Sequence, residues 1–490
     1  MNPMKNIPLL AVLAVFSVFN LSFLRAAEPR SAPYVAREYN LRVPAKLTHA
    51  APVNLGGGQR GFVFLFSEES NVDPFEGSFF FPKHPPFLAV FTEAGKELWR
   101  KELTYALPGT WFIPVLPLDM DGDGIDEIYY VNNTGPKPFV YKNYKLERLD
   151  SRTGKVTAAI SWPQPTHNQA NSYKWRFSLV GGRARDGAPV LVAGVGTYRD
   201  MRLRAFDANL KKRWEVYYPD DFDGPRASHS TAILDLDRNR HGAGQFMWGE
   251  RCIDFDDGKE RFVLDRDAWY DHSDTVLPVY DKATGKWDFW TTREKGDDGK
   301  VPRAVMFDQD GKRLWSVPDM RGHFHYGWVG NFGPAGERIA MAGRYALSEE
   351  QRDTARASGD TSKAATSVFS FYEAKTGKPL PAPKFPPSGR VVDFNGDGFH
   401  EIFTGGVLYD RFGKKIFSVK KAGALMCFHI LDLPGEQIML NTGNGKIQIW
   451  ADRNAKDAPG MAARYADPLY RENVRHSAVG YNGRVPILNY

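Results

Sequence analysis

The sequence of 490 residues predicts an all-β protein, a single β-propeller with eight four-stranded antiparallel blades; seven blades are the alternative. One phrase of strand, acidic turn and strand recurs along the chain, which is typical of a repeat architecture. The composition includes 46 glycines and 33 prolines, which favours many turns over long helices. The near-uniform spacing, without a Pro/Ser-rich linker, argues against stacked sandwiches or separate all-β domains.

The repeated phrase joins an apolar strand, a turn containing Gly-Lys and a strand that ends near Trp. It reads LAVFTEAGKELW at Leu88–Trp99 and AVMFDQDGKRLW at Ala304–Trp315. A second strand pair precedes most copies, so each unit predicts a four-stranded sheet, and closing such sheets into a ring protects their edges. We expect one helical insertion, polar and at the surface, at 351–363. We expect blades at 45–105, 111–160, 172–217, 227–265, 271–317, 322–380, 388–418 and 421–451, and a closing segment at 452–490.

Residues 1–26 have the features of a signal peptide. Lys5 precedes an apolar stretch from Ile7 to Phe23, and Ala26 and Ala27 supply the small residues that signal peptidase requires. An uncleaved N-terminal anchor is the alternative. We therefore assign 27–490 to the propeller and expect a secreted or periplasmic protein with no membrane attachment after cleavage.

Charge and cysteine content narrow the function classes. The formal charge of +6 and the pI near 9.0 are a small bias over this length, so they do not indicate a nucleic-acid partner and they favour an acidic ligand over a basic one. The two cysteines, Cys252 and Cys427, lie in apolar strand-like segments and are expected to be buried free thiols. The sequence has no GxSxG, HExxH or P-loop motif. We expect the protein to be a monomer.

Two nine-residue segments predict calcium loops carried on hairpins. Each places oxygen ligands at positions 1, 3, 5 and 9 and a backbone carbonyl at position 7, with glycines that allow the tight turn. Neither segment follows a helix or has a Glu at position 12, which argues against an EF-hand. A third segment, beginning at Asp235, lacks the ninth acid, and its metal binding stays open. The expected ligands are Asp119, Asp121, Asp123, Ile125 and Glu127 in the first loop, and Asp393, Asn395, Asp397, Phe399 and Glu401 in the second.

Histidines precede or begin the innermost strand of three consecutive units. They are His229, His272 and the pair His323 and His325. In a propeller the starts of the inner strands line one mouth of the central channel, so these imidazoles would share one funnel although they are distant in sequence. Three histidines are also a zinc ligand set, and a purely structural role is the remaining interpretation.

A funnel of His, Tyr and Arg suits the cleavage of a uronate-containing polysaccharide by β-elimination. That reaction needs a group that neutralises the carboxylate, a base that removes the C5 proton and an acid that protonates the leaving oxygen. Asp223, Asp271 and Asp274 are available for glycoside hydrolysis, but no catalytic pair stands out. We expect His229 and His272 as base and acid, Tyr270 or Tyr198 to share the proton transfer, Arg199 or Arg226 to neutralise the carboxylate, and His323, His325, Tyr173 and Arg176 to bind substrate.

Four short phrases occur in a fixed order along the chain. They are Gly194-x-Gly196-x-Tyr198-Arg199, Ser228-His229-Ser230, Asp271-His272-Ser273-Asp274 and the ending Tyr470-Arg471-x-x-Val474. Their order resembles that of propeller-type rhamnogalacturonan lyases, whose third phrase reads Gly-His-Gly-Asp. The resemblance spans roughly 85–490 and implies eight blades, calcium bound in FG-GAP-like repeats and lyase activity on pectic polymers. Ulvan lyases, which are propellers of similar length, are the close rival.

Two other functions compete with the lyase. A non-catalytic propeller that is stabilised by calcium and binds glycan or protein would carry the same loops. A quinone-cofactor dehydrogenase shares the phrases at Leu149–Lys155 and Tyr372–Lys378, but only two units fit and an adjacent cysteine pair is absent from the sequence. The expected cofactor is therefore Ca²⁺, and the expected partner is an acidic polysaccharide.

Overall fold

The computed structural model describes most of the chain. The propeller unit begins at Ser31, and the predicted signal peptide lies outside the described residues. Among the helices that are described, none has the length and apolarity to cross a membrane. The described ranges are 31–69, 83–107, 109–137, 140–164, 176–219, 222–229, 231–238, 241–281, 283–294, 301–317, 323–334, 336–347, 349–359 and 366–479.

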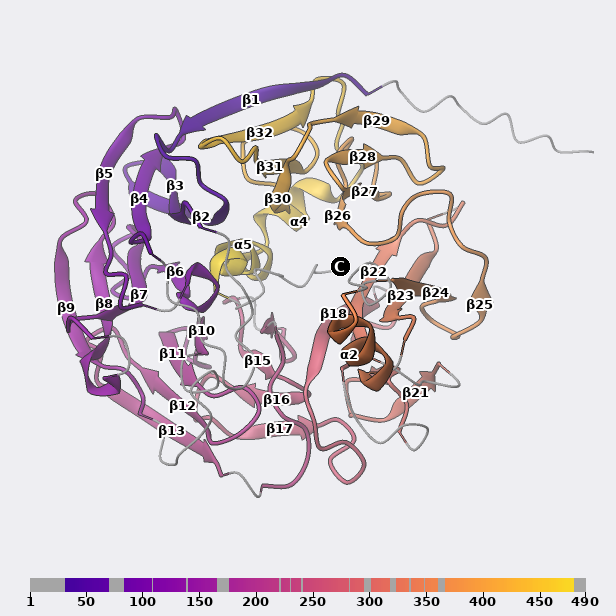
Figure 1. The fold of residues 1–490 in the computed structure, drawn as a ribbon, viewed down its shortest axis with the longest axis horizontal. Helices are drawn as coiled ribbons and strands as arrows, with labels where there is room; N and C mark the ends of the chain where they lie inside the picture. The colour runs from indigo at the N-terminus through magenta and orange to yellow at the C-terminus, as the bar shows by residue number, and fades with distance from the viewer. Residues whose placement is uncertain are drawn as a thin grey trace, which may run out of the picture. The chain divides into compact units, whose positions relative to one another are not determined.

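Eight four-stranded antiparallel sheets surround a central axis (Figure 1), which confirms the eight-bladed prediction. In seven of these sheets the strands follow one another in chain order from the inside outward. Blades 1 to 4 are β2–β5 (Leu47–Gly56, Gln59–Ser67, Phe87–Thr92, Glu97–Glu102), β6–β9 (Val115–Leu118, Glu127–Asn133, Tyr144–Asp150, Val156–Ser161), β10–β13 (Phe177–Arg183, Pro189–Val195, Met201–Phe206, Lys212–Tyr218) and β14–β17 (Ala232–Leu234, Gln245–Trp248, Arg251–Asp254, Glu260–Val263). Blades 5 to 7 are β18–β21 (Ser273–Asp281, Lys286–Arg293, Ala304–Asp308, Arg313–Ser316), β22–β25 (Phe324–Asn331, Arg338–Tyr345, Ser367–Glu373, Pro379–Leu380) and β26–β29 (Arg390–Val392, Glu401–Thr404, Val407–Tyr409, Lys415–Ser418).

Blade 8 joins the two ends of the propeller unit. It contains β30–β32 (Gly423–Phe428, Gln437–Asn441, Lys446–Asp452), and its outermost strand is β1 (Pro33–Asn40), which pairs antiparallel with β32. Figure 1 shows β1, in indigo, beside the yellow β32. The repeated phrase does not include β1, so the sequence pattern did not indicate this closure. Pairing early and late strands in one sheet removes an exposed edge from the ring.

The Trp and Gly of the repeated phrase interlock neighbouring blades. The indole of Trp99 in blade 1 donates a hydrogen bond to the carbonyl of Ser151 in the outer turn of blade 2 (2.7 Å), and a Cβ at Gly154 would lie 2.6 Å from that ring. The pairs Trp214–Gly258 and Trp315–Gly377 repeat this contact between blades 3 and 4 and between blades 5 and 6. The glycines also adopt positive φ, so both the turn and the ring exclude a side chain there.

The C-terminal helices occupy the centre of the ring in Figure 1. They are α4 (Met461–Ala466), α5 (Pro468–Arg475) and the 3₁₀ turn η3 (His476–Ala478), and Asp467 caps α5 ahead of Pro468. His476 Nε2 accepts a hydrogen bond from the Gly181 amide in β10 (2.9 Å), and Ser477 donates one to the Ala50 carbonyl in β2 (2.7 Å). The segment thus ties the inner strands of different blades together.

Three smaller elements interrupt the strands. They are η1 (Thr110–Phe112), η2 (Tyr141–Asn143) and α2 (Glu349–Ala357), which lies between β23 and β24. The expected surface insertion is therefore helical, but Arg352 and Ala355 are buried, with Arg352 stacked on the ring of Tyr345. Cys252 and Cys427 are buried free thiols, as predicted.

Candidate active site

Four histidines from blades 4, 5 and 6 meet in one cluster. His229, His272 and His323 are each less than 9% exposed. His325 is the second residue of strand β22. The rings of His229 and His272 stack with centroids 5.1 Å apart and an interplanar angle of 22°. His323 Nε2 lies 3.3 Å from His325 Nδ1. The four histidines that were predicted from the starts of the inner strands therefore lie close together.

Two carboxylates hold these histidines together. Asp274 is fully buried, with its Oδ1 3.2 Å from His229 Nδ1 and its Oδ2 in contact with His325. Glu294 contacts His272 through Oε2 and lies 3.0 Å from His323 Nε2 through Oε1. The sequence analysis missed Glu294. The available signal was its position directly after β19, the hairpin partner of β18, which places it beside His272 and Asp274.

Tyr198 and Arg176 extend the cluster into blade 3. Arg176 Nη1 donates a hydrogen bond to the Tyr198 hydroxyl (2.7 Å), and this hydroxyl lies 2.9 Å from His229 Nε2. The Tyr198 ring also lies 4.3 Å from that of His272 between centroids. The phenol oxygen is therefore placed between a guanidinium and an imidazole. Of the residues expected to act here, the structure brings together His229, His272, His323, His325, Tyr198 and Arg176.

The two stacked histidines favour opposite protonation states. Burial lowers the pKa of His229 to about 3, and the charge of Asp274 does not compensate for it. Burial also acts to lower the pKa of His272, but the carboxylates of Glu294 and Asp271 outweigh it and raise that pKa to about 10. Asp271 Oδ1 lies 2.7 Å from His272 Nδ1, so both nitrogens of this ring face a carboxylate. Adjacent groups whose pKa values are driven apart are typical of a general acid and base.

The same cluster is also a metal-ligand set. His229, His272, Asp274 and Glu294 offer donor atoms within 4.8 Å of one another, and Asp274, His323 and His325 form a second such group. Asp274 is fully buried between His229 and His325, and an ion bound between its oxygens and the imidazoles would offset the cost of burying its charge. Imidazole and carboxylate donors suit zinc and similar divalent ions. The geometry thus fits both the acid–base and the metal interpretation.

Three other residues were also expected to be catalytic, and the structure gives them different surroundings. Tyr270 is 52% exposed, and its hydroxyl donates to the Asp267 carbonyl (3.1 Å). Arg199 is exposed, and Arg226 stacks on Phe222. The catalytic roles of these three residues stay predictions. Tyr173 lies outside the described residues.

The two predicted calcium loops share one hydrogen-bond pattern. Position 1 accepts from the amide of position 6, positions 3 and 5 accept from the amides two residues on, and the ninth-position Glu accepts from the amide of position 2. In the first loop Asp119, Asp121 and Asp123 converge within 4.8 Å, and burial near them raises the pKa of Glu127 to about 7. In the second loop Asp393 Oδ1 is buried without a hydrogen-bond partner, and burial with Glu436 and Asp397 nearby raises the pKa of Asp393 well above its ordinary value. Converging carboxylates of this kind fit a hard cation.

In the third loop an arginine side chain supplies the positive charge. Arg261 Nη2 donates to Asp237 Oδ1 (2.6 Å), and its Nη1 lies 3.6 Å from Asp254. Gln245, the first residue of β15, bonds the amide of Leu236 as the ninth-position Glu does in the other two loops. In this loop Arg261 bonds an acidic residue, and the neutral amide of Gln245 takes the place of the Glu in the other two loops.

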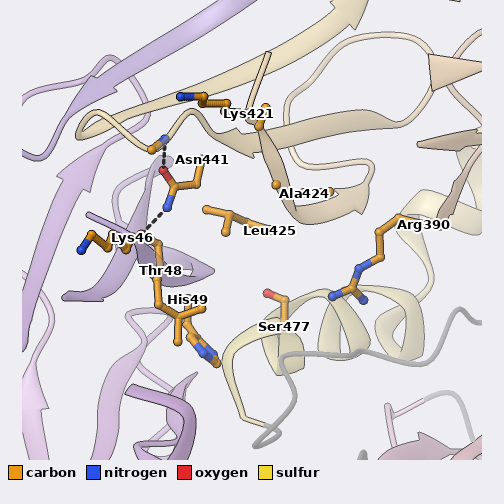
Figure 2. Close-up of a pocket in the computed structure, with 13 residues that line it drawn as sticks. Lys46, Thr48, His49, Arg390, Lys421, Ala424, Leu425, Asn441 and Ser477 are labelled. Atoms are coloured by element: carbon orange, nitrogen blue, oxygen red, sulfur yellow. Dashed lines mark hydrogen bonds between the residues drawn. The ribbon is translucent and has the colours of Figure 1, made fainter. Parts of the chain in front are cut away.

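A cationic pocket of about 420 Å³ opens beside the inner strands of blades 1, 7 and 8. Figure 2 shows Lys46, Thr48 and His49 on one side and Arg390 on the other, with Thr48 hydrogen-bonded to Asn441; Lys421 also lines the pocket. Its walls come from the starts of β2, β26 and β30, so it opens at the same mouth of the channel as the histidines. None of the thirteen lining residues is acidic.

The comparisons with known proteins concern the fold. No protein-family model matches the chain, and no curated protein matches it. The exotype rhamnogalacturonan lyase YesX superimposes with a TM-score of 0.70 at 16% identity, over 93% of this chain and 79% of that one. Rhamnogalacturonan lyase YesW gives 0.69 at 18% over 89% and 77%, and the Bacillus licheniformis rhamnogalacturonan lyase PL11 gives 0.70 at 18% over 94% and 81%. The chain therefore has the propeller fold of rhamnogalacturonan lyases.

Proposed function

We propose that this chain is an exported lyase that cleaves a uronate-containing, acidic polysaccharide of the rhamnogalacturonan or ulvan type by β-elimination. The observation that carries the proposal is the stacked pair His229 and His272, with its opposed pKa values, beside Tyr198. The fold shared with rhamnogalacturonan lyases supports it. Export rests on the features of residues 1–26.

The base side of the reaction is assigned to His229 and Tyr198. Neutral His229 contacts the Tyr198 hydroxyl through Nε2, and Tyr198 is the less buried of the two. The C5 proton of the uronate passes to the Tyr198 oxygen while the Tyr198 proton passes to His229. Arg176, bonded to the same oxygen, stabilises the negative charge that develops there.

The acid side is assigned to His272. Its raised pKa keeps it protonated at neutral pH, and its ring lies against that of Tyr198. As the C4–C5 double bond forms and the C4–O bond breaks, the leaving oxygen takes the His272 proton. Proton removal and leaving-group protonation are thus supplied from adjacent rings.

The substrate carboxylates are assigned to the cationic pocket of Figure 2. Lys46, Arg390 and Lys421 supply positive charge without a competing acid in the lining, and Thr48 and Asn441 add hydroxyl and amide groups for sugar oxygens. A negatively charged polymer that crosses the mouth between this pocket and the histidines would meet both. This placement supports an acidic polysaccharide over a neutral one.

Metal ions have two proposed roles. Calcium held by the loops at 119–127 and 393–401 would brace the inner hairpins of blades 2 and 7. An ion held by the histidine cluster would neutralise the substrate carboxylate, and in that case His272 is a ligand and proton transfer rests on Tyr198 with Arg176.

A polymer panel tests the proposal. The protein is incubated with rhamnogalacturonan, homogalacturonan, ulvan and a neutral glucan, with and without chelator, and ultraviolet absorbance is followed because each elimination creates an unsaturated uronate end. We expect absorbance to rise with one or more acidic polymers and with none that is neutral. Binding to an acidic polymer without new ends would instead favour the non-catalytic glycan-binding propeller.

A further inference from the structure

A fully buried ion pair lies directly behind the histidine cluster. Glu250, in the turn after β15 of blade 4, and Arg293, the last residue of β19 in blade 5, are both 0% exposed. Arg293 Nε donates to Glu250 Oε1 (2.8 Å) and Nη2 donates to Oε2 (2.5 Å). Such a two-pronged guanidinium–carboxylate pair fixes the relative orientation of the two groups as well as their distance.

The same carboxylate also holds the other strand of the hairpin. Ser273 Oγ donates to Glu250 Oε1 (2.5 Å), and Ser273 is the register partner of Arg293 in the β18–β19 pair. Glu250 therefore crosses a blade boundary and binds one residue from each of two adjacent strands.

The residues that Glu250 binds alternate with those of the cluster. Ser273 bonds Glu250, whereas its neighbours in sequence contact the cluster, His272 through Glu294 and Asp274 through His229. In the same way Arg293 faces Glu250 while Glu294 contacts the histidines. The position of three cluster residues therefore depends on the backbone segments that Glu250 fixes.

Net stabilisation is a weak explanation for this pair. Burying two charges carries a large desolvation cost, and apolar residues of the same volume commonly stabilise a fold as well. The ion pair fixes the register across the blade boundary, and an apolar pair would not. Asp265 and Trp269 complete the enclosure, with Asp265 Oδ2 2.8 Å from Arg293 Nη2 and the Trp269 ring beneath the guanidinium.

We propose that Glu250 is a positioning residue, which sets the spacing of His272, Asp274 and Glu294 through Ser273 and Arg293. The effect of Glu250 on turnover rests on the proposed lyase function, whereas its effect on the geometry of the imidazoles does not.

The test compares Glu250→Gln and Ser273→Ala with Glu472→Gln in the full chain. Glu472 is a matched control, since it is a buried carboxylate that bonds Arg183 and the Ala243 amide away from the cluster. The readouts are the imidazole nitrogen resonances of ¹⁵N-histidine-labelled protein at one fixed pH, kcat and KM on the acidic polymer, and thermal stability. Ser273→Ala removes one hydrogen bond and no charge, so it keeps the test available where Glu250→Gln does not fold.

We expect Glu250→Gln to lower kcat roughly tenfold to a hundredfold and Ser273→Ala roughly threefold, with KM little changed, because a small misplacement of reacting groups costs that much. Both variants should shift the resonances of His272 and His323, whereas Glu472→Gln should lower stability without shifting them. Unmoved resonances and unchanged kcat in Ser273→Ala and in folded Glu250→Gln would overturn the positioning role. Shifted resonances in a protein whose wild type cleaves no acidic polymer would retain the positioning role and overturn the proposed lyase.

Discussion

The loops at 119–127 and 393–401 take their donor groups from nine consecutive residues, whereas the histidine cluster collects its groups from blades 3 to 6, between Arg176 and His325. In the loops a local turn brings the carboxylates together, so their arrangement does not depend on contacts between blades. In the cluster the groups meet because consecutive inner strands start at the same mouth of the channel. Damage to a loop should therefore act on stability, and damage to the cluster should act on chemistry.

The largest expected effect is on the cluster. His229→Gln and His272→Gln should each lower kcat on the acidic polymer by roughly a thousandfold, since each removes one proton-transfer group. Calcium-dependent thermal stability should not change, because neither residue lies in a calcium loop. The measurement is initial rate by ultraviolet absorbance, with His84→Gln, an exposed histidine bonded to Glu69, as the matched control. Full activity in His229→Gln and His272→Gln would refute the assignment.

The loops should show the reverse pattern. Asp119→Asn with Asp393→Asn should abolish the rise in unfolding temperature on calcium addition, which we expect to correspond to about 3 kcal/mol for each loop at a hundredfold excess over Kd. Asp237→Asn in the third loop is the control and should keep that rise, because Arg261 already satisfies this carboxylate. Calorimetric melting with and without chelator provides the measurement. An unchanged calcium response in the double variant would remove calcium bracing from the account.

These loops and the repeat are the parts that the sequence pattern could predict. The phrase with its Trp and Gly recurs along the chain and predicts a propeller, with eight blades favoured over seven, and the ligand positions at Asp119 and Asp393 are visible in consecutive residues. The cluster was only half predicted. The histidines share a place before inner strands, but Glu294 comes from the end of a second strand, and its role depends on the β18–β19 register. Tyr270 was predicted to be catalytic because it lies close to His272 in the sequence. The structure shows Tyr270 exposed and His272 buried, so closeness in sequence did not place both in the cluster.

A third prediction concerns pH and the central helices. Burial lowers the pKa of His476 to about 4, and its Nε2 accepts a hydrogen bond from Gly181, which requires the neutral ring. The unfolded chain takes up a proton near pH 6.5 and the folded chain only near pH 4, so the free energy of unfolding should fall as pH drops through this window, by about 1.4 kcal/mol per pH unit at most.

His476→Gln isolates this contribution, because glutamine can accept the same hydrogen bond and does not titrate. Denaturant unfolding at several pH values between 7 and 4 should give a shallower slope for the variant than for the wild type. Equal slopes would mean that His476 does not couple the helices to pH.

The smallest expected effect is at the third loop. Arg261→Gln should release Asp237 and Asp254 and allow one additional calcium ion to bind weakly, because Gln245 offers a neutral oxygen where the other loops have Glu. Adding Gln245→Glu should tighten that binding. Calcium titration calorimetry gives the stoichiometry. The same number of ions in wild type and in both variants would show that the guanidinium does not substitute for the metal.

The central claim is that the cluster eliminates rather than hydrolyses. The most direct measurement is mass spectrometry of the products after digestion of the acidic polymer in water enriched in heavy oxygen. β-Elimination predicts fragments with an unsaturated uronate at one end and no heavy oxygen from the solvent. Saturated fragments that carry one solvent oxygen at each new reducing end, or no new ends with any uronate polymer, would contradict it.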